Sequence, residues 1–529
     1  MRVVNQSTTI GNFKISLTTI KRTFFVGLFV LVFNSFGATS ASAQSTDVYI
    51  TPDGGGNGVC TNNTHPPNWF NNSANWGNGS SQIGAGTVVH LCGTFNGSEG
   101  TTLLSAQGGG SSGRPVTILF ENGTTLQSPA FTAAIDITTR QYLTVDGGTN
   151  GVIKNTANGT SLSLQRSQST GVSASDCTPG CRITNLSIMD LYVRNSNDPL
   201  NGIDQTSIDA VSFLRAPGIR VDHNIVTNCG WCLSGFGSGM EIDHNDISKM
   251  DHGVASGCGG TCTNETVHDN HFHDMGQWDT TNNAYHHDGI HFFSEGGSAQ
   301  GPLIYNNLFD GNLGVNTTAW IFIEGVSGGL GVHGAVIFNN VLLDSVNSAK
   351  IMLWMEGHGS SSNNSAFNNY FYNGNGMGMG MFVRGETNFS AKNNIVGIIS
   401  YQGTSIVSGG VDNNIYYDSN ADFGNNNLFG WNSSTVSSIT TWRTLCGCDG
   451  AGKLATAAII NVANVGIIAA PSNAIGAGAN LSYLGIPALN SDKNGNPRAK
   501  NGPWDAGAYN SGSSSAIIPP PTALKAIVN

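Results

Sequence analysis

The chain has 529 residues, of which only 10% are charged, and its formal net charge is −11. Because an acidic surface repels other polyanions, this charge argues against nucleic acid as a partner. The chain also contains 71 glycines, and glycine costs about 1 kcal/mol relative to alanine inside a helix. The composition therefore predicts an all-β protein that is rich in turns.

Residues 1–43 have the features of a signal peptide. Basic residues, no acidic ones and an apolar run at 24–33 are followed by small residues that end at Ala43. The apolar run is shorter than the roughly 20 residues that cross a bilayer, and no later stretch comes closer. We therefore expect cleavage after Ala43 and a secreted protein, extracellular or periplasmic, without a membrane span.

All ten cysteines follow this segment, and eight of them lie in close sequence pairs, which leaves Cys60 and Cys92. In an exported protein this usage indicates disulfides. A redox site at Cys229 and Cys232, or a zinc site, is the alternative. The βαβ pattern that a redox Cys-x-x-Cys motif needs is missing.

An asparagine recurs through the middle of the chain, preceded by a polar or aromatic pair and followed by alternating apolar residues. The spacing varies between 20 and 37 residues, which is the range of solenoid repeats, in the series Asn224, Asn245, Asn270, Asn307, Asn340, Asn369, Asn394 and Asn414. Asparagines at the same turn of stacked coils can bond to the coils above and below. The series predicts a parallel β-helix with a structural asparagine ladder.

A second column appears when residues 288–293, 320–323, 351–354 and 381–384 are aligned. Each of these segments is followed by a glycine next to a glutamate, at Glu295, Glu324, Glu356 and Glu386. We expect these carboxylates near one edge of consecutive coils. Stacked like charges repel unless they are exposed, protonated or bridged by a cation.

The two ends of the chain resemble exported β-helix proteins. Residues 48–54 and 86–94 resemble the entry of the pectate-lyase-like superfamily, and residues 491–498 with 504–509 resemble the closing motif of the same bacterial proteins. The resemblance implies a right-handed parallel β-helix. The expected organisation is a signal peptide (1–43), an N-terminal cap with the first strands (44–110), the β-helix (111–430), C-terminal coils with the closing motif (431–510) and a flexible tail (511–529).

Nine of the thirteen histidines lie between residues 223 and 291. The interval from Asn270 to Asn307 is the longest in the series, so residues 277–285 should project as a loop beside the next strand. Histidine and aspartate are also ordinary turn residues, which is the simpler interpretation. The functional one is an exposed groove whose predicted catalytic residues are His287, Asp288, Lys350 and Arg384.

Such a groove suits β-elimination on a polysaccharide that contains uronic acids. His287 or Lys350 would act as the base, and Arg384 would hold the uronate carboxylate. Calcium, which prefers several oxygen ligands, would be held by Asp288, Glu324 and Glu356. The predicted substrate-binding residues are His291, Trp278, Tyr285 and His286, whereas Trp320 and Trp354 are expected in the core.

Two local matches keep other functions open. Residues 241–244 resemble the Asp-His strand motif of pectate lyases, but the Arg-Pro-Arg surroundings of that family's base are absent. Residues 356–359 resemble the Gly-His-Gly motif of polygalacturonase-type hydrolases, for which Asp288 and Glu324 would supply the carboxylates. The alternatives are a glycoside hydrolase and a non-catalytic, glycan-binding surface protein. In each case the partner is a polysaccharide or glycan, and a monomer is expected.

Overall fold

The computed structural model describes residues 47–158, 164, 167–193, 208–275, 287–313, 317–344, 351–373, 379–417, 429–455 and 472–511. All of them belong to one compact unit, Gln44–Asn529. The predicted signal peptide and all but the first residue of the predicted tail lie outside these ranges. Within them, no helix combines the length and the apolar character of a membrane span.

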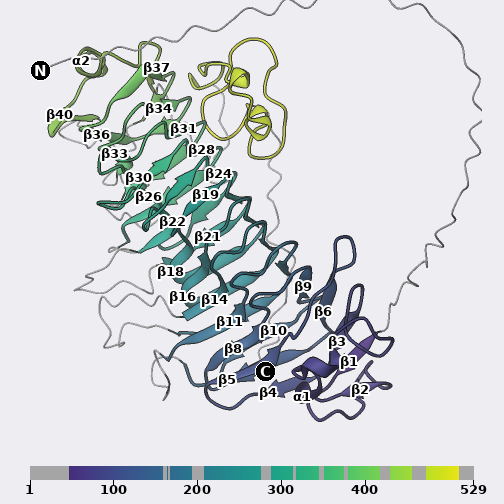
Figure 1. Cartoon of the computed structure of the whole chain (residues 1–529). Helices are drawn as coiled ribbons and strands as arrows, with labels where there is room; N and C mark the ends of the chain where they lie inside the picture. Colours follow the sequence, from purple (N-terminus) through teal and green to yellow (C-terminus); the bar gives the residue numbers. More distant parts are fainter. Residues whose placement is uncertain are drawn as a thin grey trace, which may run out of the picture. The chain divides into compact units, whose positions relative to one another are not determined.

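The described unit is a right-handed parallel β-helix, as predicted, and its stacked coils are visible in Figure 1. One side of every coil belongs to a 14-stranded sheet, called sheet A here. Its strands are β1 (Val48–Ile50), β2 (Thr64–His65), β3 (Val88–Leu91), β6 (Val116–Phe120), β9 (Leu143–Asp146), β12 (Arg182–Thr184), β15 (Arg220–Asp222), β17 (Glu241–Asp243), β20 (Thr266–His268), β24 (Leu303–Tyr305), β28 (Val336–Phe338), β31 (Ser365–Phe367), β34 (Phe389–Lys392) and β37 (Ile406–Asp412).

A second, 24-stranded sheet forms two further sides, because β16 and β18 run through both. The side that follows sheet A in the chain is called face two. It contains β4 (Thr94–Asn96), β7 (Thr125–Ser128), β10 (Val152–Asn155), β13 (Ser187–Met189), the first parts of β16 (Ile225–Gly235) and β18 (Asp246–Gly257), β21 (His271–His273), β25 (Leu308–Asp310), β29 (Val341–Asp344), β32 (Tyr370–Asn373), β35 (Ile395–Val396), β38 (Ile415–Tyr416) and β41 (Lys453–Leu454).

The remaining side is called face three. It contains β5 (Thr101–Ser105), β8 (Phe131–Asp136), β11 (Ser169–Ser173), β14 (Ile208–Phe213), the second parts of β16 and β18, β22 (Asp288–Phe293), β26 (Ala319–Glu324), β30 (Ile351–Glu356), β33 (Met379–Arg384), β36 (Ile398–Gln402) and β39 (Phe429–Trp431). A small third sheet between face three and sheet A joins β19 (Thr261–Thr263), β23 (Ser298–Gln300) and β27 (Val332–His333).

Short elements occur near both ends of this unit. They are α1 (Pro67–Phe70), the 3-10 turn η1 (Ser73–Asn75), the hairpin strand β40 (Ser434–Val436), α2 (Ile439–Cys446), and the 3-10 turns η4 (Ser482–Leu484) and η5 (Pro487–Asn490). The side chain of Ser438 caps α2 by accepting from Thr441 N, and Gly447 ends the helix in the left-handed conformation.

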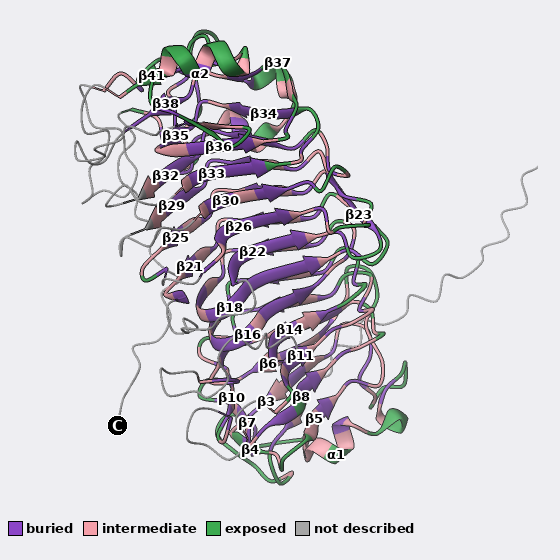
Figure 2. Cartoon of the chain, turned by 90° about the vertical axis from the view of Figure 1, so that its left-hand side faces the viewer, coloured by how far each residue is buried: buried purple, intermediate pink, exposed green. Residues whose placement is uncertain are grey.

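The core is built from the middle residue of each short sheet A strand. These residues are in register from coil to coil and fully buried: Val145, Ile183, Val221, Ile242, Val267, Ile304, Ile337 and Ala366. In Figure 2 the strands of face three are mostly buried. Apolar residues that alternate along each strand thus form one continuous column.

The predicted asparagine ladder is confirmed over its whole length. Each amide Nδ2 donates to the Oδ1 of the next asparagine at 3.0–3.1 Å, from Asn224 through to Asn414. The residue before each of them has φ between 52° and 61°, a conformation that histidine, aspartate and asparagine tolerate, at His223, His244, Asp269, Asn306, Asn339, Asn368, Asn393 and Asn413. This pair forms the turn from sheet A to face two.

The segment 472–511, which contains the predicted closing motif, lies along the flank of the coils rather than beyond the last one (Figure 1). The turn asparagines donate to its backbone: Asn339 to Ser491 O at 2.8 Å and Asn413 to Ala477 O at 2.8 Å. Arg498, which is buried, donates in return to Asn339 Oδ1 at 2.8 Å. The reason for this position is the row of outward amides, which offers hydrogen bonds along several coils.

Four of the five disulfides join the sequence neighbours, and the fifth joins the two remaining cysteines, Cys60 and Cys92. No cysteine is free, and Cys229 bonds to Cys232 within the coil formed by β16. The disulfide prediction is therefore confirmed.

Candidate functional site

The histidines that are close in sequence lie on three different sides of the β-helix. His286 lies outside the described residues. The others divide into His223, His244 and His268 at sheet A, His271 and His273 on face two, and His252, His287 and His291 on face three. The sequence cluster is therefore not a single site.

The histidines at sheet A belong to a row of ion pairs. Arg220 donates to both carboxylate oxygens of Asp243 at 2.9 and 2.7 Å, and His244 Nδ1 lies 2.7 Å from Asp243 Oδ2. Although burial acts to raise the pKa of Asp243, the hydrogen bonds from His244 and Arg220 hold this pKa well below its usual range. These contacts tie neighbouring coils together and have a structural role.

Face three carries a row of aromatic side chains, called the aromatic row: His291, Phe322, Trp354 and Phe382. Trp354 is half-buried, and the other three are buried. The four residues are register partners in β22, β26, β30 and β33, four strands that lie side by side in Figure 2. Successive ring centroids are 4.9, 5.1 and 5.4 Å apart. The row alternates with inward residues such as Ile321 and Ile323, which belong to the core. Trp320 is fully buried in the core, as expected, whereas Trp354 is only partly buried.

At one end of this row lies a buried group of acids and histidines: Asp251, His252, His287, Asp288 and His291. His252 lies 3.7 Å from Asp251 and 3.5 Å from Asp288, and His287 forms an ion pair with the other oxygen of Asp251. Ala319 N donates to Asp288 Oδ1 at 3.1 Å. The side chains of His287 and Asp288 are 3% and 0% exposed, so the structure brings these predicted residues together below the surface.

Further along the row lie two glutamates with cationic neighbours. Glu324 and Glu356 are register partners in β26 and β30. Glu324 is 3.2 Å from His291 Nε2 and 3.9 Å from His358 Nε2. Glu356 Oε2 accepts from Trp354 Nε1 at 3.2 Å and from Arg384 Nε at 2.6 Å. Each carboxylate therefore faces at least one potential cation.

Four predicted site residues, Lys350, Trp278, Tyr285 and His286, lie outside the described residues, and their roles stay predictions. Among the others, the structure separates Arg384 in β33 from Asp288 in β22, with β26 and β30 between them.

The predicted column of four carboxylates reduces to two. The register partner of Glu324 on one side is Phe293, and that of Glu356 on the other side is Arg384. Glu386 is buried and accepts from Asn364 Nδ2 at 3.0 Å, and burial raises its pKa to about 7. Glu295 and Glu386 lie beyond the ends of β22 and β33, whereas Glu324 and Glu356 are the last residues of β26 and β30.

The predicted calcium ligand set is also not formed. Within the part of the chain that the structure describes, Asp288 groups with His252 and His291, whose ligand atoms lie within 4.8 Å of one another, and not with Glu324 and Glu356. Calcium takes about six to eight oxygen ligands. Two imidazoles with one carboxylate instead suit a transition metal.

One residue of this site had no role in the sequence prediction. His358 follows β30, its side chain is 34% exposed, and Gly359 N donates to Gly385 O at 3.2 Å in the next coil. His358 therefore lies beside the end of β33, where Arg384 is. The Gly-His-Gly motif at 357–359 was the available signal.

No family model matches the chain, and no curated protein matches it. Several solved structures share the general architecture. The Dettilon tailspike protein is 15% identical with a TM-score of 0.41, and the match covers 65% of this chain and 61% of that one. A mannuronic-acid-specific polysaccharide family 6 lyase from human gut microbiota is 16% identical with a TM-score of 0.35, covering 67% and 87%. Pectate lyase Pel9A is 15% identical with a TM-score of 0.34, covering 89% and 98%.

These values describe a shared arrangement of coils and carry no argument about activity. The chain spans only 61% of the length of the tailspike that it matches. The chemistry of this protein must therefore be argued from its own side chains.

Proposed function

We propose that the outward side of face three binds an acidic polysaccharide and cleaves it by β-elimination, and that the protein is a secreted carbohydrate-active enzyme. The observation that carries the proposal is that His358 and Arg384 lie beside the aromatic row, next to Glu324 and Glu356. This face combines the half-buried ring of Trp354 with the partly exposed guanidinium of Arg384.

The spacing of the row supports a polymeric ligand. Neighbouring strands in a sheet are about 4.7–4.9 Å apart, so the aromatic side chains recur at nearly the length of one sugar unit. A polysaccharide lying along the axis of the β-helix would meet one outward residue per coil. The exposed part of Trp354 would offer a sugar face an apolar contact area.

The charged groups supply what β-elimination needs. Arg384 is 48% exposed, and its bonds to Glu356 use only part of its five donors. A uronate carboxylate held by this guanidinium would be neutralised, which makes removal of the neighbouring ring proton easier. His358 would accept that proton as the general base. The electron pair left on the ring would form a carbon–carbon double bond as the neighbouring glycosidic C–O bond breaks, and the departing oxygen would take a proton from water. His287 and Lys350, the bases predicted from the sequence, remain proposals for the same role.

The test is incubation of the purified chain with a panel of uronic-acid polymers, followed by the ultraviolet absorbance of the unsaturated product. We expect His358→Gln to lower the rate by about 10²–10⁴-fold, the usual contribution of a general base. His333→Gln, in β27 of the small third sheet, is the matched control and should retain full activity. If the wild type forms no unsaturated product on any polymer, β-elimination is wrong.

The register of Glu324 and Glu356 favours one other candidate, a glycoside hydrolase. Retaining hydrolases place two carboxyl groups about 5–5.5 Å apart, which is close to the distance between neighbouring strands. Reducing ends released without the unsaturated product, and lost in Glu324→Gln, would identify hydrolysis. Binding of a polymer with no product of either kind would instead identify a glycan-binding surface.

A further inference from the structure

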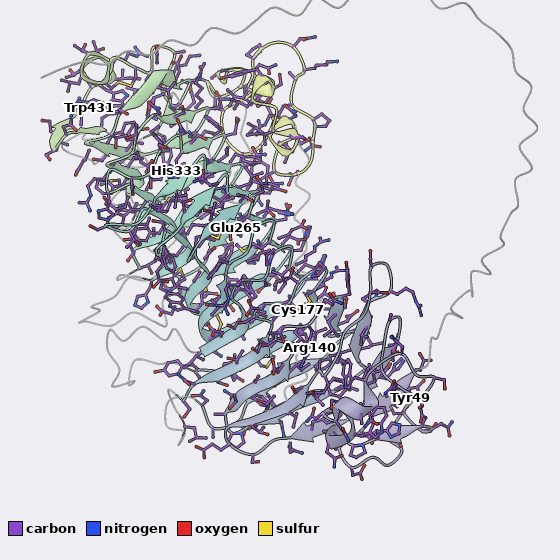
Figure 3. The ribbon with its side chains drawn as sticks, in the orientation of Figure 1. Tyr49, Arg140, Cys177, Glu265, His333 and Trp431 are labelled. Carbon is purple, nitrogen blue, oxygen red and sulfur yellow. A yellow bond between two sulfur atoms is a disulfide. The ribbon has the colours of Figure 1, made fainter. Side chains whose placement is uncertain are left out.

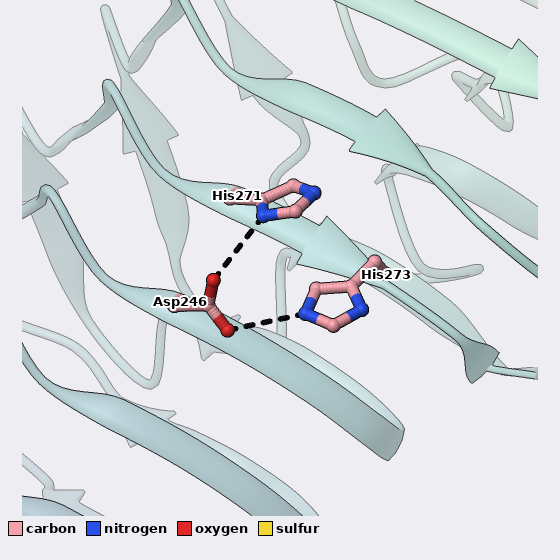
Figure 4. Close-up of side chains that lie close together, drawn as sticks. All are labelled: Asp246, His271 and His273. Carbon is pink, nitrogen blue, oxygen red and sulfur yellow. Dashed lines mark hydrogen bonds and ion pairs between the residues drawn. The ribbon is translucent and has the colours of Figure 1, made fainter. Parts of the chain in front are cut away.

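A second group of histidines and carboxylates lies on face two, away from the aromatic row. Asp246 of β18 lies between two imidazoles of β21: its Oδ2 is 3.2 Å from His271 Nδ1, and its Oδ1 is 3.1 Å from His273 Nε2 (Figure 4). The two rings are stacked with centroids 4.4 Å apart. Three side chains thus direct four potential metal-ligand atoms toward one another.

The strand register explains why they meet. Asp246 is the register partner of His271, and His273 is two residues further along β21 on the same side of the sheet. The residue between them, Phe272, is fully buried in the core. Both imidazoles therefore point outward, and their side chains are 29% and 23% exposed.

We propose that Asp246, His271 and His273 form a binding site for one divalent transition-metal ion, with zinc as the ion best matched to the ligands. Zinc is held by histidine nitrogen and carboxylate oxygen at about 2.0–2.2 Å in tetrahedral sites. Ligand atoms on a tetrahedron of that size are about 3.3 Å apart. The nitrogen–oxygen separations of 3.2 and 3.1 Å, one to each oxygen of the Asp246 carboxylate, are close to this edge.

The outer nitrogen of each imidazole supports the same conclusion. His271 Nε2 lies 2.8 Å from Asp310 Oδ1, and His273 Nδ1 lies 2.7 Å from Asp274 Oδ2. A histidine that binds metal through one nitrogen characteristically donates the other N–H to a carboxylate, which fixes the ring and its tautomer. Here both rings are held in this way, and in each case the nitrogen that remains faces Asp246.

Metal binding would use only the inner nitrogen of each imidazole, His271 Nδ1 and His273 Nε2. The outer N–H bonds to Asp274 and Asp310 are retained, so binding requires no rearrangement of the surrounding side chains.

The other groups of potential ligands in the described residues are less suitable. Cys258 and Cys262 are joined in a disulfide, so they offer no thiolate to an ion beside Glu265. At sheet A the carboxylates of Asp222 and Asp243 already hold arginines, whose positive charge opposes a cation. The His252 group belongs to the candidate site of face three.

The experiment uses the whole protein, free of histidine tags and stripped with a chelator, and titrates it with Co²⁺ as a spectroscopic probe and with Zn²⁺ by calorimetry. We expect one ion per chain with the visible absorption of nitrogen- and oxygen-ligated Co²⁺, displaced by Zn²⁺ but not by Ca²⁺. His271→Ala with His273→Ala should abolish it. The control, His333→Ala, lies at a residue labelled in Figure 3 and should bind as the wild type does.

Asp310→Asn provides a second test that leaves all three ligands in place. Loss of such an outer carboxylate typically weakens a metal site by about 10–100-fold, and we expect a decrease of that size. Circular dichroism establishes that each variant is folded. Binding that is absent from the wild type, or unchanged in the double histidine variant, would overturn the proposal.

Discussion

Replacing Asn307 by alanine tests the asparagine ladder at its centre. Asn307 is fully buried, and its Nδ2 donates to Val267 O at 3.0 Å and to Asn340 Oδ1 at 3.0 Å. Its Oδ1 accepts from Asn270 N at 3.0 Å and from Asn270 Nδ2 at 3.1 Å. Alanine removes all four bonds at a place where the neighbouring groups are also buried.

The largest part of the cost comes from the groups that are left behind. A buried donor without its acceptor costs about 1–3 kcal/mol, and each ordinary hydrogen bond contributes about 0.5–1.5 kcal/mol net. The backbone N–H of Asn270 loses its side-chain acceptor, while Asn270 Nδ2 keeps its bonds to Ile242 O and His268 O. We therefore expect Asn307→Ala to lower the free energy of unfolding by about 3 kcal/mol.

The assay is urea unfolding followed by circular dichroism and by tryptophan fluorescence, with Asn96→Ala as the matched control. Asn96 is exposed and accepts a single side-chain bond, from Gln127 Nε2 at 2.8 Å. Its replacement should change stability by no more than about 0.5 kcal/mol. If both variants unfold at the same urea concentration, the ladder does not stabilise the coils as argued.

Three further predictions concern a buried glutamate, a core leucine and the disulfide that closes the longest loop. Burial raises the pKa of Glu265, labelled in Figure 3, to about 7. The folded state therefore holds a proton that the unfolded chain releases near pH 4.5. As a result, the free energy of unfolding falls as the pH rises through this window. Glu265→Gln should remove up to about 3 kcal/mol of this dependence between about pH 5 and pH 8, and equal pH profiles for both proteins would contradict the assignment. Leu353→Ala should cost about 2–5 kcal/mol in urea unfolding because it leaves a cavity in a fully buried position, and a loss below about 1 kcal/mol would mean that the coils close around the gap. Replacing Cys60 and Cys92, which are 32 residues apart, by serine should cost about 3–4 kcal/mol, and an unchanged urea midpoint would show that the loop is ordered without the bond.

Regularity explains what the sequence could predict. Asn270 and Asn307 were predicted as neighbours in a ladder although 37 residues separate them, because every coil repeats the same turn chemistry. A disulfide framework was likewise predicted from the close sequence pairs of cysteines, although the pairing of Cys60 with Cys92 was not assigned. Both predictions needed only the order of features along the chain, and they did not depend on the length of any loop.

The site was less predictable because it depends on how far each strand extends. Glu295 and Glu324 look equivalent in the sequence, yet Glu324 ends β26 opposite Phe293, so the earlier glutamate falls two residues past the strand. Histidines that are close in sequence were separated for a related reason: His273 lies on face two and His287 on face three, on different sides of the β-helix. The pattern of residues along the sequence does not show where one face of the β-helix ends and the next begins.

The position of segment 472–511 has a consequence for the order of folding. Its Lys493 donates to Asn306 O across 187 residues of sequence, and Asp505 O accepts from Asn368 across 137 residues. Stacking of coil upon coil is otherwise a process between near neighbours in the chain. Contacts of such long sequence separation form late and slow folding. The coils that contain Asn306 and Asn368 can therefore stack early. Segment 472–511 covers their outer flank only after it has been synthesised.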